Sequence, residues 1–177
     1  MSNQTNGKVR PSIVEEFQTK LTGDNLKYAL DFASHWGTDD VSAESGDFCG
    51  RVMYKGKDVC YIKVGGFDDS NLDHWIIWSI HDANIAETPD FLVDERIKEG
   101  FWANVNHCGH FLSGGKHCGC GKQPGKRKAI FGKEFDNVCN SDMVFTNPDA
   151  EALECAKVMV DLRKRTIDNA DMRERSK

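Results

Sequence analysis

Four cysteines lie between His107 and Cys139, and their number and setting are typical of a metal site. The four cysteines are Cys108, Cys118, Cys120 and Cys139. The same segment contains three histidines, His107, His110 and His117. Thiolates and imidazoles bind zinc, and a loop can direct several of them at one ion when glycines let the backbone turn tightly. The sequence therefore predicts a glycine- and cysteine-rich metal-binding loop, with residues 107–139 as a metal-binding subdomain.

The spacing of these cysteines limits what the site can be. The pattern C-x9-C-x-C-x18-C differs from the paired C-x2-C of a zinc ribbon. Gly119 lets the thiolates of Cys118 and Cys120 face one ion, and glycine N–H groups can donate to sulfur. A structural zinc bound by the four cysteines is expected. The alternatives are a histidine in place of one cysteine, an iron–sulfur cluster on the same four cysteines, and a loop without metal.

The same segment lacks residues that a hydrolytic or phosphate-binding enzyme site needs. A catalytic zinc needs an open position and a general base, but no Asp or Glu occurs between His107 and Lys133. Cys120 with His110 or His117 could form a nucleophile pair, although a thiol that shares its loop with three others is more naturally a ligand. Gly121–Arg127 lacks the spacing of a phosphate-binding P-loop.

Basic charge gathers on the cysteine-rich segment. Six basic residues and no acidic one lie between His107 and Lys133, so with a whole-chain charge of −5 the rest of the chain carries −11. The run Lys126, Arg127, Lys128 has two interpretations. It can offset the net charge of −2 that four thiolates leave on a zinc ion, or it can bind an anion. The acidic remainder argues against nucleic acid as a partner.

Hydrophobic periodicity predicts an α+β fold. No regular βαβ alternation occurs, which favours a largely antiparallel sheet with helices on one face. A capping box at Ser12 and Glu15 indicates the start of the first helix. The expected elements, in chain order, are helices over 12–22 and 24–37, a hairpin of Phe48–Tyr54 and Val59–Val64, a central strand His74–His81, a helix starting at Thr88–Pro89, short strands Ala129–Phe135 and Asp142–Phe145, and a helix from Asn147–Pro148 to Arg165.

Length and composition predict one domain in the cytoplasm. The 177 residues suit a single α+β domain over 11–165, with a polar, disordered N-terminus (1–10) and a charged, frayed C-terminal tail (166–177). No apolar run approaches the roughly 20 residues of a membrane span, and the first ten residues do not form a secretory signal. In a reducing compartment, clustered cysteines are more often ligands than disulfides.

The three remaining cysteines fall in apolar patterns. Pairing Tyr54 with Val59 would keep Cys49 and Cys60 about four residues apart along the hairpin, too far for a disulfide. Cys155 belongs to a helical apolar stripe. All three are predicted to pack as small hydrophobes.

The C-terminal part of the chain resembles a known group of proteins. Pro124–Lys126 (PGK), Ile130–Cys139 (IFGKEFDNVC) and Phe145–Cys155 (FTNPDAEALEC) resemble an uncharacterised family of cysteine-containing proteins from anaerobic Gram-positive bacteria, over the last third to half of the chain. That family has no established activity, so the resemblance implies no catalytic residues. The Tyr54–Lys57 hairpin is also similar to small bacterial α+β domains of unknown function.

Two functions from different classes are consistent with these observations. The first is a non-enzymatic cytoplasmic protein in which a structural zinc stabilises a module that binds a small molecule or another protein. The alternative is an enzyme with a pocket between the strand of Trp75 and Trp78 and the metal loop, using His74, His81 or the loop histidines. The absence of acidic residues from the loop favours the first.

Overall fold

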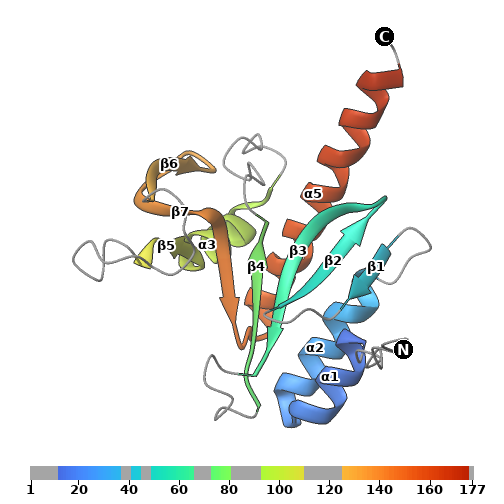
Figure 1. Ribbon diagram of the computed structural model, residues 1–177. Coiled ribbons are helices and arrows are strands. Elements are labelled where there is room, and N and C mark those ends of the chain that lie inside the picture. Colours follow the sequence, from blue (N-terminus) through green and yellow to red (C-terminus); the bar gives the residue numbers. More distant parts are fainter. Residues whose placement is uncertain are drawn as a thin grey trace, which may run out of the picture.

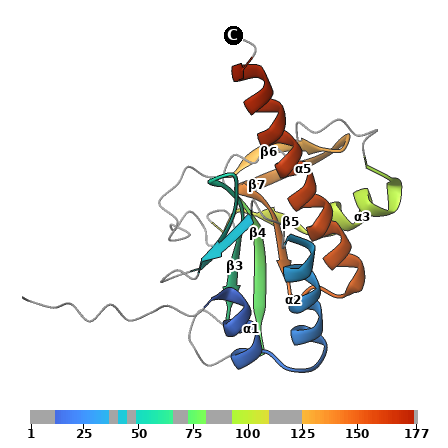
Figure 2. The ribbon, with the colours of Figure 1, turned by 90° about the vertical axis from the view of Figure 1, so that its right-hand side faces the viewer.

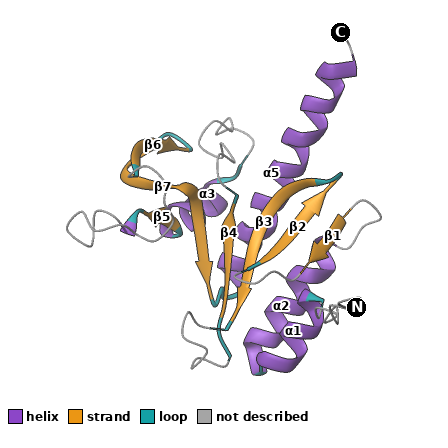
Figure 3. Cartoon of the chain, in the orientation of Figure 1, coloured by secondary structure: helices purple, strands orange, loops and turns teal. Residues whose placement is uncertain are grey.

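The computed structural model describes residues 12–36, 41–44, 49–65, 73–80, 93–109 and 125–175. These residues form four helices and a seven-stranded sheet in which every paired strand is antiparallel (Figure 3). The strand order is β1-β2-β3-β4-β7-β5, and β6 pairs with β7 outside this path. The predicted α+β class with a largely antiparallel sheet is confirmed. Most of the predicted metal-binding loop, residues 110–124, lies outside the described residues.

The first helix begins where the sequence predicts, and the second begins at Gly23, before the expected start at Asp24. They are α1 (Ile13–Lys20) and α2 (Gly23–Trp36). The predicted capping box is confirmed, because the Glu15 N–H donates to Ser12 Oγ at 3.2 Å and the Ser12 N–H donates to the Glu15 carboxylate at 2.6 Å. These two bonds satisfy amide groups that the first helical turn leaves without partners.

The hairpin of β2 (Gly50–Tyr54) and β3 (Lys57–Val64) has a tighter turn than expected. Tyr54 pairs with Lys57 and not with Val59. Lys55 and Gly56 both take positive φ, 51° and 71°, and such a two-residue turn matches the twist of the strands. The predicted register is therefore wrong. On the outer side, β1 (Val41–Glu44) extends the sheet.

Strand β4 (Trp75–Ser79) lies between β3 and β7, as its apolar composition predicts. Trp75 is completely buried, and its ring centroid lies 5.6 Å from that of Phe17 and 6.1 Å from that of Phe32. Aromatic pairs at these separations contribute roughly 0.5–1.5 kcal/mol beyond the area that they bury. The main core is thus the junction of α1, α2 and the central strand.

The third helix begins later than expected. Helix α3 (Glu95–Ala103) is capped by Asp94, whose carboxylate accepts from the Ile97 N–H at 3.0 Å. Val93 and Asp94 are not helical, so the helix that contains Ile97 and Phe101 does not run continuously from the expected start at Thr88–Pro89. Thr88 and Pro89 themselves lie outside the described residues.

Strands β5 (Val105–His107), β6 (Lys126–Ile130) and β7 (Lys133–Thr146) carry the described ends of the cysteine-rich segment. Phe131 and Gly132, with φ of 46° and 78°, form the turn between β6 and β7. The expected strand Ala129–Phe135 is therefore interrupted by a turn, and one long strand runs through Cys139. Figure 1 shows β7 leaving the β6 hairpin and turning to run beside β4.

The final helix is longer than predicted. Helix α5 (Ala150–Arg175) continues beyond Arg165, because the hairpin contacts it there. Ile167 is 2% exposed, and Lys55 forms an ion pair with Asp168 at 2.7 Å. The tail that was expected to fray is helical to Arg175.

Helices α2, α3 and α5 lie on the same side of the sheet in the view of Figure 2. Contacts of α3 and α2 with α5 connect this helical layer. Within the described part of the chain, no helix has both the length and the apolar composition of a membrane span.

Candidate metal centre

Cys108 lies at the base of the segment that carries the other predicted ligands. It directly follows β5, is 2% exposed, and its N–H donates to the Asn137 carbonyl of β7 at 2.7 Å. His107 pairs with Val138 across the same two strands. Cys108 is therefore fixed against β7 at the point where the chain leaves the sheet.

The chain returns to the same place at Gly125. A Cβ atom added to Gly125 would lie 2.6 Å from the Cβ of Cys108 and 2.6 Å from the Asn137 carbonyl oxygen, closer than carbon atoms approach. The next residue, Lys126, pairs with Val138 of β7. The two ends of the segment 110–124 thus meet beside one another on β7, and only glycine fits at the returning end.

Cys139 occupies an irregular stretch of β7. Between the pairs His107 with Val138 and Val105 with Met143, β5 advances by two residues and β7 by five. Residues 139–142 form this bulge, and Cys139 is half-buried within it. Bulges bend a strand and redirect its side chains, and they are frequent next to functional sites.

The structure places two of the four predicted cysteine ligands. Cys118 and Cys120 lie outside the described residues, as do His110 and His117. Among the described residues, no group of three or more His, Cys, Asp and Glu side chains has the arrangement of a metal site. The zinc site, the histidine substitutions and the iron–sulfur alternative therefore remain predictions.

His107 is the one predicted histidine substitute that is described. Its ring is exposed, and Nδ1 lies 3.1 Å from the Asp136 carbonyl oxygen. A protonated Nδ1 donates to this carbonyl, which leaves Nε2 as the nitrogen available to a metal.

The three predicted anion-binding residues have different surroundings. Arg127 forms ion pairs with Glu134 and, at 3.7 Å, with Asp136 on the exposed side of the hairpin. Lys128 forms an ion pair with Asp142, which is 1% exposed. Carboxylates of β7 therefore already balance two of the three cations, while Lys126 is exposed at the start of β6.

Asp142 was missed by the sequence-based reasoning. It lies three positions after Cys139 in a run that continues as Met143, Val144 and Phe145. A carboxylate in an apolar strand indicates a buried charge partner, and this signal could have identified it.

The cysteines that were assigned to the core have thiols with raised pKa values. Burial raises the pKa of the completely buried Cys60. It also raises the pKa of Cys155, which is 2% exposed, to about 11. Cys155 Sγ donates to the Ile97 carbonyl at 3.7 Å. Burial of both is confirmed, whereas Cys49 is only half-buried.

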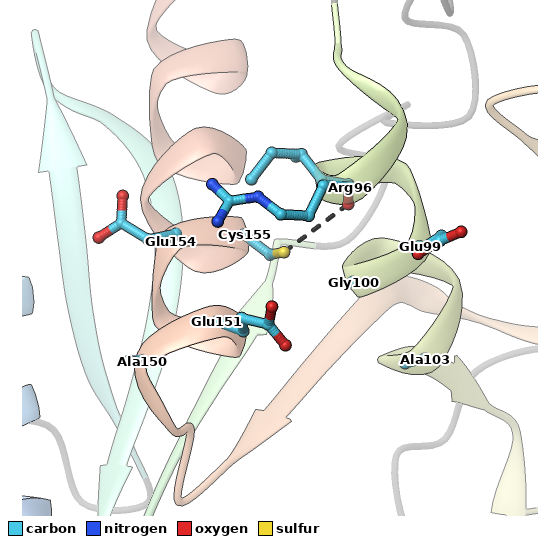
Figure 4. A pocket seen from close by; sticks show the side chains of 9 residues that line it. Arg96, Glu99, Gly100, Ala103, Ala150, Glu151, Glu154 and Cys155 are labelled. Atoms are coloured by element: carbon cyan, nitrogen blue, oxygen red, sulfur yellow. Dashed lines mark hydrogen bonds between the residues drawn. The ribbon is translucent and has the colours of Figure 1, made fainter.

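The described residues form a cavity of about 420 Å³ between α3 and α5, and none of its lining residues belongs to the cysteine-rich segment (Figure 4). It has Cys155 and Gly100 in its wall. Its charged lining residues are Arg96, Glu99, Glu151 and Glu154.

The residues suggested for an enzyme pocket lie in different environments. Trp75 is part of the core, and Trp78 on the other face of β4 is half-buried. His74 Nδ1 lies 3.1 Å from the Asn147 side-chain amide, and His81 lies outside the described residues. The tryptophans thus do not share one face of the strand.

Comparison of the chain with protein-family models, with curated protein sequences and with solved structures gives no match.

Proposed function

We propose that the chain is a non-enzymatic binding module whose cysteine-rich segment is held together by one structural zinc ion. The ligands are Cys108, Cys118, Cys120 and Cys139, with an iron–sulfur cluster on the same residues as the alternative. Zinc in a closed four-thiolate site contributes folding free energy directly.

The observation that carries this proposal is the meeting of the segment's two ends on β7. Cys108 and Gly125 are in contact there, and Cys139 belongs to the same strand, one residue after Val138. A glycine-rich segment that leaves and returns at one point has little apolar area with which to order itself, and a shared ion supplies the missing cross-link.

The electrostatic surroundings argue against an exposed anion site. Arg127 and Lys128 already have carboxylate partners, so a free phosphate would compete with fixed internal anions. These two cations therefore balance mainly the carboxylates of β7.

The cavity between α3 and α5 supports a role in binding. Its volume of about 420 Å³ falls within the range of small-molecule sites, roughly 300–1,000 Å³. A zinc ion at the cysteine-rich segment would stabilise the protein without touching a molecule bound in this cavity.

Cobalt(II) titration of the reduced, metal-free chain tests the proposal, because cobalt in a tetrahedral thiolate site has a characteristic visible spectrum. The expected result is saturation at one equivalent, followed by displacement with zinc. Cys139→Ser and Cys118→Ser should abolish the thiolate spectrum, while Cys49→Ser and Cys155→Ser should retain it. Equal loss in all four variants would show that the cysteines have been divided wrongly.

A further inference from the structure

Lys128 connects the two ends of the β7 bulge. Its ammonium group forms an ion pair with Asp142 and donates to the Cys139 carbonyl at 3.2 Å. The Asp142 side chain is 1% exposed and that of Lys128 is 23% exposed. One side chain of β6 thus holds both the first and the last residue of the segment 139–142.

Its neighbour Arg127 has the same charge and no such contact. Successive side chains of a strand point to opposite faces, and Arg127 pairs with Glu134, where both side chains are exposed at 65% and 62%. Exposed ion pairs of this kind contribute about 0–1 kcal/mol. The basic run therefore contains two cations with separate roles.

The Lys128–Asp142 pair is poorly explained by stability alone. Removing a carboxylate from water costs several kcal/mol, and a buried ion pair often stabilises a fold no better than an apolar pair of the same size. What this pair supplies is a fixed geometry for the backbone at Cys139. Groups that orient a metal ligand affect metal affinity strongly even though they do not touch the ion.

We infer that Lys128, held by Asp142, is a positioning residue of the metal centre: its hydrogen bond to the Cys139 carbonyl fixes the bulge from which the Cys139 thiolate reaches the ion. This inference rests on the proposed zinc site. It also gives Lys128 a role that Arg127 does not have, although the sequence shows them only as neighbouring residues of the same charge.

The test compares zinc affinity in Lys128→Met/Asp142→Leu with that of the wild type. The double variant removes the hydrogen bond to Cys139 without leaving a buried charge unpaired. We expect its zinc dissociation constant to rise between about tenfold and a hundredfold, with an altered cobalt spectrum. The urea unfolding of the metal-free protein should be unchanged or shifted to higher urea. Arg127→Gln is the matched control and should stay within about twofold of the wild type.

Asp142→Asn provides a second measurement that does not depend on the double variant folding. It keeps the side-chain size and an acceptor oxygen but removes the negative charge that pairs with the Lys128 ammonium, and we expect a loss of zinc affinity of about threefold or more. Wild-type affinity in the variants that fold, with an unchanged cobalt spectrum, would overturn the positioning role and leave the zinc site standing. A wild-type chain that binds neither zinc nor cobalt would overturn both.

Discussion

Two regions of this molecule are stabilised in different ways. The helix-packed region, defined as α1, α2, α5 and strands β2–β4, encloses a continuous apolar core that includes the fully buried Trp75. The cysteine arm, defined as β5 with Cys108, β6 and residues 133–139 of β7, contributes few side chains to that core, among them Val105, Ile130 and Val138. The first region follows from apolar patterning, and for the second we propose the zinc ion as an additional source of folding free energy.

The cysteines of the two regions differ in the same way. Burial raises the pKa values of Cys60 and Cys155 and favours their protonated thiols. Cys108 and Cys139 lie where the chain leaves the sheet and where β7 is irregular. Cys108 is as buried as Cys155, so position in the chain and not burial distinguishes the two groups. We propose that the breaks in secondary structure at Cys108 and Cys139 leave their thiols available to a metal.

The largest expected effect is a loss of stability in the core with no change in zinc content. Trp75→Ala removes the ring that contacts Phe17 and Phe32 and should lower the free energy of unfolding by about 3–5 kcal/mol. Zinc bound per folded chain should stay the same. Urea unfolding and metal analysis check both results. A variant that folds but has lost its metal would show that the two regions are not separate.

Two glycine-to-alanine substitutions, at Gly125 and Gly100, should have effects of intermediate size on the free energy of unfolding. Gly125→Ala places a Cβ 2.6 Å from Asn137 backbone atoms and from the Cys108 Cβ, and should cost about 1–3 kcal/mol in urea unfolding. Gly100→Ala meets Cys155 Sγ at 2.2 Å and should cost a similar amount.

The two variants should differ in how they can be rescued. In Gly100→Ala/Cys155→Ala the nearest remaining atom is a Cβ at 3.6 Å, an ordinary contact, and alanine favours the helix by about 1 kcal/mol. Stability should return close to that of the wild type. Gly125→Ala/Cys108→Ala should not recover, because alanine at position 108 keeps the Cβ atom that blocks the site and the Asn137 backbone blocks it as well. Recovery there would mean that the backbone can shift to accept the added Cβ.

The smallest effect concerns pH. Burial raises the pKa of Cys155 to about 11, whereas a thiol in the unfolded chain ionises near 8.5. The folded protein therefore holds the proton more tightly, and the resulting stability is complete below pH of about 8.5 and is lost as the pH rises toward 11. Urea unfolding between pH 8 and 10 should show a steeper decline for the wild type than for Cys155→Ser. Parallel declines would contradict the buried state of this thiol.

Local patterns predicted much of the fold. The Ser12–Glu15 capping box, the central position of β4 and the burial of Cys60 and Cys155 all follow from residues that are close in sequence. The β2–β3 register and the turn at Phe131 depend on backbone torsions at single positions, which composition does not reveal. Sequence periodicity predicts which face of a helix or strand is buried more reliably than it predicts where a turn lies.

The geometry around the cysteines depended on contacts between distant residues. The approach of Gly125 to Cys108 and the bulge that contains Cys139 arise from the pairing of β7 with two other strands. The buried partner of Lys128 lies fourteen positions away in the sequence. Spacing singled out the cysteines as candidate ligands, but it could not show that Lys128 contacts the backbone of Cys139.

Elemental analysis of the purified, reduced chain, combined with titration of its thiols before and after chelation, tests the metal centre most directly. The expected result is one zinc per chain, with four thiols that react only after the metal is removed. A chain made in zinc-replete medium that contains no metal, and in which the thiols of Cys108, Cys118, Cys120 and Cys139 react freely, would contradict it.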